Sequence, residues 1–232
     1  MAFHYTDKSS RSSFVETIWQ TVDMDDGVYM APADGSWDLI FTYENGGIRV
    51  LFSGPTSRPT PTPYKAGNIN VGIRFRPGAF MTQVSSRDML DKIEILPVEN
   101  NETFRLLGHI FAIPTFETAD VLIEQMERAN LLGEDEVVDR VLRGAETPLT
   151  NRSVQRHVRQ STGLPLGHHR RIQQAQQAVA LLQKGYTPIK AAYEAGYADQ
   201  AHMTRTLKKL TSYTPAEIAA ASEQIIVEHH VK

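Results

Sequence analysis

Apolar residues occupy every second position over much of the first part of the chain, the period expected of a strand with one buried face. Segment 39–43 has this pattern, an Asn-Gly-Gly sequence follows it, and a second apolar run fills 48–52. Left-handed turn residues between two such runs predict a β-hairpin. Segment 69–75 alternates in the same way, with polar side chains that include Arg74 on its other face. We therefore expect an antiparallel sandwich or barrel.

Prolines and a change of period mark the rest of the chain. The prolines at 55, 59, 61 and 63 predict an extended loop that cannot belong to a central strand. After residue 100 the apolar spacing becomes three and four, which is typical of helices. We expect helices over about 100–110, 118–132, 135–142, 151–161, 168–183, 188–195, 200–210 and 215–221.

These elements predict an α+β chain of two domains. The N-terminal domain is antiparallel and β-rich, either cupin-like or a sandwich, and the C-terminal domain is all-α with two helix-turn-helix units. The expected boundaries are a flexible arm at 1–13, a β-rich domain at 14–100, a helical linker at 101–134 and a helical domain at 135–232.

Charge is distributed unevenly along the chain, although its net value is only −3. Residues 148–213 contain ten basic and two acidic side chains, a net charge of +8. Residues 116–147 contain three basic and nine acidic side chains, a net charge of −6. A basic segment next to helical motifs is the electrostatic pattern of a duplex-binding surface, whereas a solvated charged face is the ordinary alternative.

The segment from Gly196 to Lys209 has the pattern of a turn followed by a recognition helix. Gly196 ends the preceding helix, and the carboxylate of Asp199 can accept hydrogen bonds from the first amides of the next one. Met203 and Leu207 then lie on one face, while polar side chains suited to base edges and phosphates lie on the others.

Several classes of protein are disfavoured. The chain has no cysteine, which excludes disulfides, thiolate metal sites and a cysteine nucleophile. The adjacent pairs His168-His169 and His229-His230 lack the spacing of metal ligands on a helix, so we expect neither a metal nor another cofactor. We find no P-loop, dinucleotide fingerprint or serine-histidine-acid set, and we expect no enzyme. No apolar run is long enough for a transmembrane helix or a signal peptide, which predicts a cytoplasmic protein without membrane contact.

The two helical units together resemble the DNA-binding domain of AraC/XylS-type transcriptional regulators over about residues 135–220. In the second unit Gly196-Tyr197, the helix 203–209 and the closing Tyr213-Thr214-Pro215 match the family pattern, with Ser212 in place of the usual glycine. In the first unit 153–165 matches the first recognition helix and its glycine exit. One departure is the polar linker 144–150, where the family usually has a tighter turn.

The resemblance implies a bacterial regulator and a role for particular side chains. Positions that face bases in the family are occupied by Arg152, Gln155, Arg156, His202, Thr204 and Arg205. Phosphate contacts are expected from Arg159, Gln200, Lys208 and Lys209. Two recognition helices held ~34 Å apart would enter successive major-groove turns of double-stranded DNA.

The β-rich domain gives weaker indications. The segments 32–41 and 71–79 resemble an uncharacterised domain found ahead of AraC-type domains, where such modules sense a small-molecule effector or form a homodimer. Trp37, Arg74 and Arg76 are candidate effector contacts, although Trp37 could equally be a core residue. For the arginines, salt bridges to Asp34 and Asp38 compete with an anionic-ligand site.

Two other functions are alternatives to a DNA-binding regulator. A DNA-repair methyltransferase with an AraC-like module needs an acceptor cysteine, which this chain lacks. A degenerate member of the family could act through protein contacts, or through ligand binding by its N-terminal domain, in place of DNA binding. An activator would additionally contact RNA polymerase.

Overall fold

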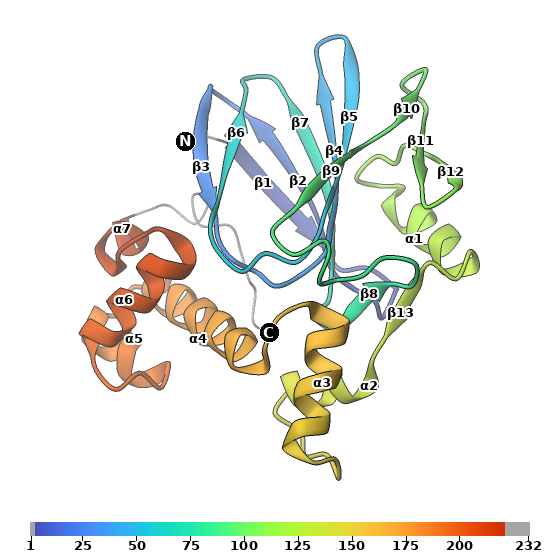
Figure 1. Ribbon diagram of the computed structural model, residues 1–232. Coiled ribbons are helices and arrows are strands. Elements are labelled where there is room, and N and C mark those ends of the chain that lie inside the picture. Colours follow the sequence, from blue (N-terminus) through green and yellow to red (C-terminus); the bar gives the residue numbers. More distant parts are fainter. Residues whose placement is uncertain (1–2, 221–232) are drawn as a thin grey trace.

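A six-stranded antiparallel sheet forms the centre of the β-rich part (Figure 1). The computed structural model describes residues 3–220. In spatial order the strands are β1 (Phe3–Lys8), β2 (Val15–Asp23), β7 (Ile69–Phe75), β4 (Asp38–Glu44), β5 (Gly47–Ser53) and β9 (Ile93–Leu96). The predicted hairpin is confirmed as β4 and β5, with Phe41 opposite Val50 and a φ of +104° at Gly46 in the turn.

Three small sheets surround the large one. They are β3 (Gly27–Ala31) with β6 (Thr60–Tyr64), β8 (Ala79–Met81) with β13 (Leu132–Glu134), and β10 (Val98–Glu99), β11 (Thr103–Leu106) and β12 (His109–Ala112). The proline-rich segment is thus partly a strand. Pro61 and Pro63 are tolerated there because a strand of a two-stranded sheet has one edge that needs no ladder hydrogen bonds.

The two faces of the large sheet differ in polarity. Phe41 and Ile73 lie on the apolar face, where the buried residues of helix α1 (Ala119–Arg128) complete the core. The other face carries the polar members of the same strands, including Thr42, Asn70 and Arg74. The alternation predicted for 69–75 is therefore confirmed, and the polar face looks toward β3 and β6.

Two predictions about the β-rich part are wrong. The expected flexible arm at 1–13 contains β1, which pairs with β2 over its whole length because Phe3 is buried. The expected helix at 100–110 is the β11–β12 hairpin, and positive φ angles at Asn100, Asn101 and Leu107 interrupt any helix there. Strand pairing and core residues of the β-rich part consequently continue to β13, well beyond residue 100.

Six helices make up the rest of the described chain. They are α2 (Glu136–Leu142), α3 (Asn151–Thr162), α4 (Leu166–Gln183), α5 (Pro188–Glu194), α6 (Gln200–Thr211) and α7 (Pro215–Ala220). Each predicted helix after residue 134 is present with nearly the expected bounds, and His229-His230 lie outside the described residues. Figure 1 shows α3 near one end of α4 and α5 to α7 near the other. None of the helices within residues 3–220 has the length and apolar character needed to cross a membrane.

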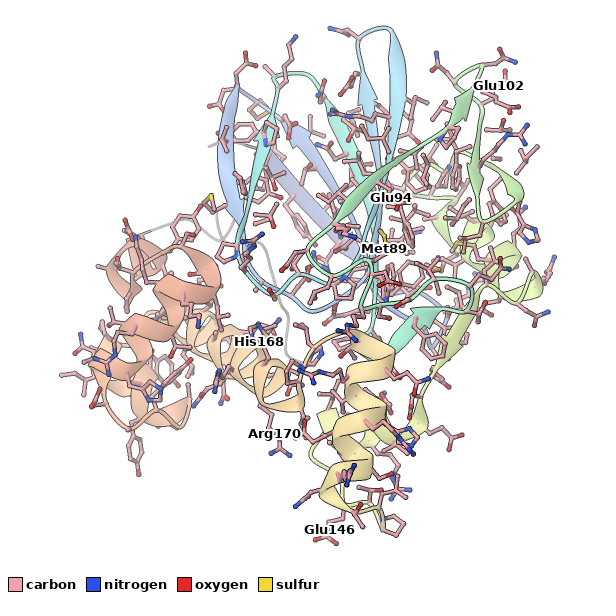
Figure 2. All side chains as sticks on the ribbon, in the orientation of Figure 1. Met89, Glu94, Glu102, Glu146, His168 and Arg170 are labelled. Atoms are coloured by element: carbon pink, nitrogen blue, oxygen red, sulfur yellow. The ribbon has the colours of Figure 1, made fainter. Side chains whose placement is uncertain are left out.

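Hydrogen bonds join the helical part to the β-rich part at both of its ends. Near α6, the N–H of Ala33 donates to the carbonyl oxygen of Leu210 at 2.8 Å. Near α3, the hydroxyl of Ser86 donates to the carbonyl oxygen of Ser161 at 2.7 Å. Between them, His168 on α4 turns toward the β-rich part, while Arg170 points away from it (Figure 2). The helical part is therefore held against the N-terminal part of the molecule at both of its ends.

Candidate nucleic-acid interface

Local capping and one apolar face define helix α6. The carboxylate of Asp199 accepts a hydrogen bond from the N–H of His202 at 2.6 Å, which satisfies one of the free amides at the start of the helix. Met203, Leu207 and Leu210 are buried in the same cluster as apolar residues of α4. Burial of this face leaves the remaining side chains of α6 directed outward.

The turn before α6 is fixed by its backbone and by α4. Gly196 has a φ of +73°, a left-handed conformation that glycine adopts without strain. The side-chain amide of Gln174 on α4 donates to the carbonyl oxygens of Ala195 and Gly196, both at 3.0 Å. These bonds anchor the turn, and with it the start of α6, to the long helix.

The outer face of α6 carries the predicted DNA contacts. Gln200, His202, Arg205, Lys208 and Lys209 are exposed, and Thr204 is half-buried with its hydroxyl bonded to the carbonyl oxygen of Gln200 at 2.8 Å. The ring of His202 also packs edge-on against Tyr197, with 5.3 Å between ring centroids. Tyr197 therefore supports the ring of His202, which is one of the predicted base contacts.

The first unit is built around the carboxylate of Asp135. It caps α2 by accepting from the N–H groups of Val137 and Val138, and it also contacts Nδ1 of His157 on α3 at 2.7 Å. Burial acts to raise the pKa of Asp135, but the hydrogen bonds from His157 and the two amides outweigh it and lower that pKa. One side chain thus fixes α3 relative to α2.

Helix α3 presents a second polar face. Thr150 caps it by accepting from the N–H of Ser153, and Gly163 ends it with a φ of +74°. Val154 and Val158 are buried against α2. The predicted contacts Arg152, Gln155, Arg156 and Arg159 are all exposed.

The basic side chains of these two faces are electrostatically uncompensated. Within residues 3–220, Arg152, Arg156, Arg159, Arg205 and Lys209 form no ion pair, and Lys208 has only a long contact of 3.9 Å with Glu217. Unpaired arginines can donate two hydrogen bonds to a guanine edge or to a phosphate. The arrangement is chemically suited to a polyanion.

A family model described as a helix-turn-helix domain matches residues 144–221, the segment that contains α3 to α7. Residues 144–221 are a helix-turn-helix domain of the AraC type. The predicted AraC-type helix-turn-helix domain and the predicted two-part fold are confirmed, and the match covers less than half of the chain.

Solved structures of ToxT from Vibrio cholerae resemble this chain over most of its length. One crystal form aligns with 10% identity and a TM-score of 0.45, covering 94% of this chain and 98% of ToxT. ToxT bound to (E)-4-(8-methylnaphthalen-1-yl)but-3-enoic acid aligns with 9% identity and a TM-score of 0.44, covering 94% and 98%. ToxT bound to an unsaturated fatty acid aligns with 10% identity and a TM-score of 0.38, covering 97% of each chain. No curated protein matches the sequence.

The AraC-type domain departs from the sequence expectations in a few places. Ile189 lies at the apolar spacing of α5 but is 72% exposed, because Ala191 and Ala192 face the core of the AraC-type domain instead. The contacts made by Gln174 and by His157 were not predicted. Their side chains belong to polar positions of ordinary helices, and only the packing of α4 on the turn, and of α3 on α2, gives them a role.

Ahead of the AraC-type domain, the candidate effector contacts occupy three different environments. Trp37 is 1% exposed and stacks on Phe52 at 5.1 Å between ring centroids, and it lines neither the cavity that contains Arg74 nor the one that contains Arg76. Arg74 lines a cavity of about 220 Å³, where Nη2 lies 3.2 Å from Asp34 and Nε lies 3.1 Å from Asp38. Arg76 lines another cavity. The structure therefore does not bring these three residues together.

Proposed function

We propose that α3 and α6 are two recognition helices through which one chain reads a bipartite site in double-stranded DNA. The observation that carries this proposal is the shared design of the two helices, each with a buried apolar face and an exposed face of unpaired basic and amide side chains. Two such helices in one chain would give an asymmetric site with half-sites about one helical turn apart.

The longest donors on each helix are the proposed base readers. Arg156 on α3 and Arg205 on α6 can each grip O6 and N7 of guanine, and Gln155 can pair with adenine in the same bidentate manner. Arg152, His202 and Thr204 lie on the same faces and complete the proposed base contacts. Each good bidentate pair contributes about 1–3 kcal/mol of discrimination against other bases.

The remaining polar side chains are proposed to bind phosphates. Arg159 and Lys208 lie in the last turn of α3 and of α6, and Lys209 is next to Lys208. Gln200 lies at the start of α6, where free amides favour an anion. Such contacts set affinity and register more than sequence preference, so they should appear in the salt dependence of binding.

We also propose that a small-molecule effector acts through the β-rich part. The loop 32–36 supports this because it contacts both the cavity of about 220 Å³ and the AraC-type domain. Its Asp34 carboxylate pairs with Arg74 in the cavity, and its Ala33 N–H bonds to the end of α6. A change at the cavity therefore has a direct route to a recognition helix. We also propose that the β-rich part can form a homodimer.

A second candidate function is protein binding by the outer face of α5. Ile189 is 72% exposed and Tyr193 is 81% exposed, and their spacing of four residues places them on one side of the helix. In an activator this apolar pair would suit RNA polymerase. Tyr193→Ala should then leave DNA affinity unchanged and lower activated transcription in vitro, whereas a loss of DNA affinity would count against this role.

Selection of bound sequences from a randomised duplex library tests the DNA-reading proposal. We expect enrichment of a bipartite motif whose halves are centred about 10 base pairs apart. A single short motif would leave only one recognition helix in use. No enriched sequence at moderate salt would favour the protein-binding alternative.

A further inference from the structure

The cavity of about 220 Å³ lies between the polar face of the six-stranded sheet and the β3–β6 pair. Its lining contains three carboxylates, from Asp23, Asp34 and Asp38, and two guanidinium groups, from Arg49 and Arg74. Both cations already have partners. Arg74 is shared between Asp34 and Asp38, and Arg49 pairs at 2.7 Å with Glu44, which lies outside the lining. An anionic ligand therefore finds no free positive charge here.

One carboxylate in the cavity has no cation. Asp23 is 3% exposed and, within residues 3–220, forms no ion pair; its carboxylate accepts a hydrogen bond from the side-chain amide of Asn70 at 3.2 Å. Burial raises the pKa of Asp23, and the hydrogen bonds from Asn70 and from the backbone of Lys65 offset this effect only in part. A cation in the cavity would compensate this charge.

Aromatic rings form another part of the lining. Phe3, Tyr29 and Tyr64 contact one another, with ring centroids 5.6–6.4 Å apart. Trp19 lies against Gly72, where an added Cβ would meet the indole at 2.0 Å. Its indole N–H is buried and has no hydrogen-bond partner in the described part of the chain. The cavity thus offers π faces for a cation.

We propose that this cavity binds a small organic cation, such as a quaternary ammonium ion or a protonated amine, held by the carboxylate of Asp23 and by the rings of Trp19 and Tyr29. This inference names the chemical class of the effector and rests on the proposed ligand response. The volume suits a molecule about the size of choline.

Isothermal titration of the full chain with choline and with 3,3-dimethylbutan-1-ol tests the proposal. The alcohol has the shape of choline but a carbon atom in place of the charged nitrogen. We expect choline to bind at least about tenfold more tightly, because cation–π and carboxylate attraction both require the charge. Equal binding of the two compounds would overturn the proposal, as would the failure of choline, tetramethylammonium and n-butylammonium to bind at millimolar concentration.

Two variants locate the site. Asp23→Asn should weaken choline binding about tenfold, while Asp88→Asn, which changes an exposed carboxylate outside the cavity, should not. Equal affinity in both variants would place the cation elsewhere and overturn the assignment. The comparison of choline with its neutral analogue uses the wild-type protein, so it still tests the proposal if Asp23→Asn fails to fold.

DNA affinity measured with and without choline separates this inference from the proposed function. Binding of choline with unchanged DNA affinity would support the cation site and contradict the proposed ligand response. If the protein binds DNA sequence-specifically but binds none of the three cations, the proposed DNA reading is supported and the cation site is contradicted.

Discussion

The N–H of Ala33 donates a hydrogen bond to the carbonyl oxygen of Leu210 over 2.8 Å, and this bond joins the β-rich part to the end of helix α6. The residues after Ala33 extend the connection. Asp34 pairs with Arg74, and Gly35 lies so close to His169 of α4 that an added Cβ would meet its ring at 2.8 Å. The loop 32–36 is therefore a physical link between the cavity and the AraC-type domain.

Replacement of Arg74 by methionine should destabilise the protein strongly. The guanidinium compensates two buried carboxylates, Asp34 and Asp38, and its removal leaves both unpaired at a cost of about 3–5 kcal/mol. Burial raises the pKa of Asp38 to about 7 even with Arg74 present, so without it Asp38 can avoid the cost at low pH by protonation. Urea unfolding should thus show a larger loss at pH 8 than at pH 5.

Arg49→Met provides the control for this variant. Arg49 and Glu44 also form an ion pair, but their side chains are 45% and 39% exposed, and such pairs contribute about 0–1 kcal/mol. A loss in Arg74→Met as small as that in Arg49→Met would contradict the role given to the buried cluster.

The sequence predicted the helical part better than the β-rich part, for physical reasons. Helix ends are encoded locally, by caps such as Asp199 and Thr150 and by left-handed glycines such as Gly163. The strands depend on partners distant in sequence: β1 pairs with β2 and buries Phe3, which the local sequence of 1–13 does not reveal. The segment 100–110 has apolar spacing that suits a helix. It forms part of the β11–β12 hairpin instead, where Leu107 and Gly108 in the turn have positive φ.

The exposure of the proposed DNA contacts was predictable, because exposure follows from the helical period once the apolar face is known. All four predicted contacts on α3 are exposed. The supporting contacts were not predictable. One is the hydrogen bond from Gln174 to the turn before α6, and the other is the contact of Asp135 with His157. Each joins two elements whose packing cannot be inferred from the local sequence.

Gly163→Ala should destabilise the protein more than Gly185→Ala. Both glycines have positive φ, +74° and +84°, and both substitutions cost about 1–2 kcal/mol in backbone strain. A Cβ at Gly163 would in addition meet the carbonyl oxygen of Ser86 at 2.7 Å, whereas none of the described atoms lies within 4 Å of a Cβ at Gly185. Equal thermal unfolding midpoints for the two variants would argue against close contact between α3 and the β-rich part.

Ser212→Gly should stabilise the protein. Ser212 ends α6 with a φ of +69°, a conformation that costs a non-glycine residue about 1–2 kcal/mol. Glycine removes this strain and loses part of the gain through its greater freedom in the unfolded chain, which leaves about 1 kcal/mol. Chemical denaturation measures the change, and a decrease in the free energy of unfolding would show that the serine side chain has a stabilising role.

His169 should make stability depend on pH. Burial, with a smaller effect of the neighbouring His168, lowers the pKa of His169 to about 4 from its ordinary 6.5. The unfolded chain therefore binds a proton more readily than the folded one between these values. The stabilisation is present above pH 6.5 and is lost as the pH falls toward 4, by up to about 3 kcal/mol.

His169→Gln isolates this contribution from the other titrating groups. The free energy of unfolding of the wild type, relative to that of His169→Gln, should fall as the pH is lowered from 7 to 4.5. A constant difference between the two proteins across this range would mean that His169 titrates normally in the folded state.

Base reading by two helices is the central claim, and fluorescence anisotropy on the selected duplex tests it most directly. Arg156→Ala and Arg205→Ala are each measured against duplexes with changes in one half-site or the other, with Arg170→Ala as a control for loss of exposed positive charge on α4. We expect each variant to lose about 1–3 kcal/mol of discrimination at one half-site only, and the two variants to affect opposite halves. Equal loss at both halves, or the uniform weakening expected of Arg170→Ala, would contradict the claim.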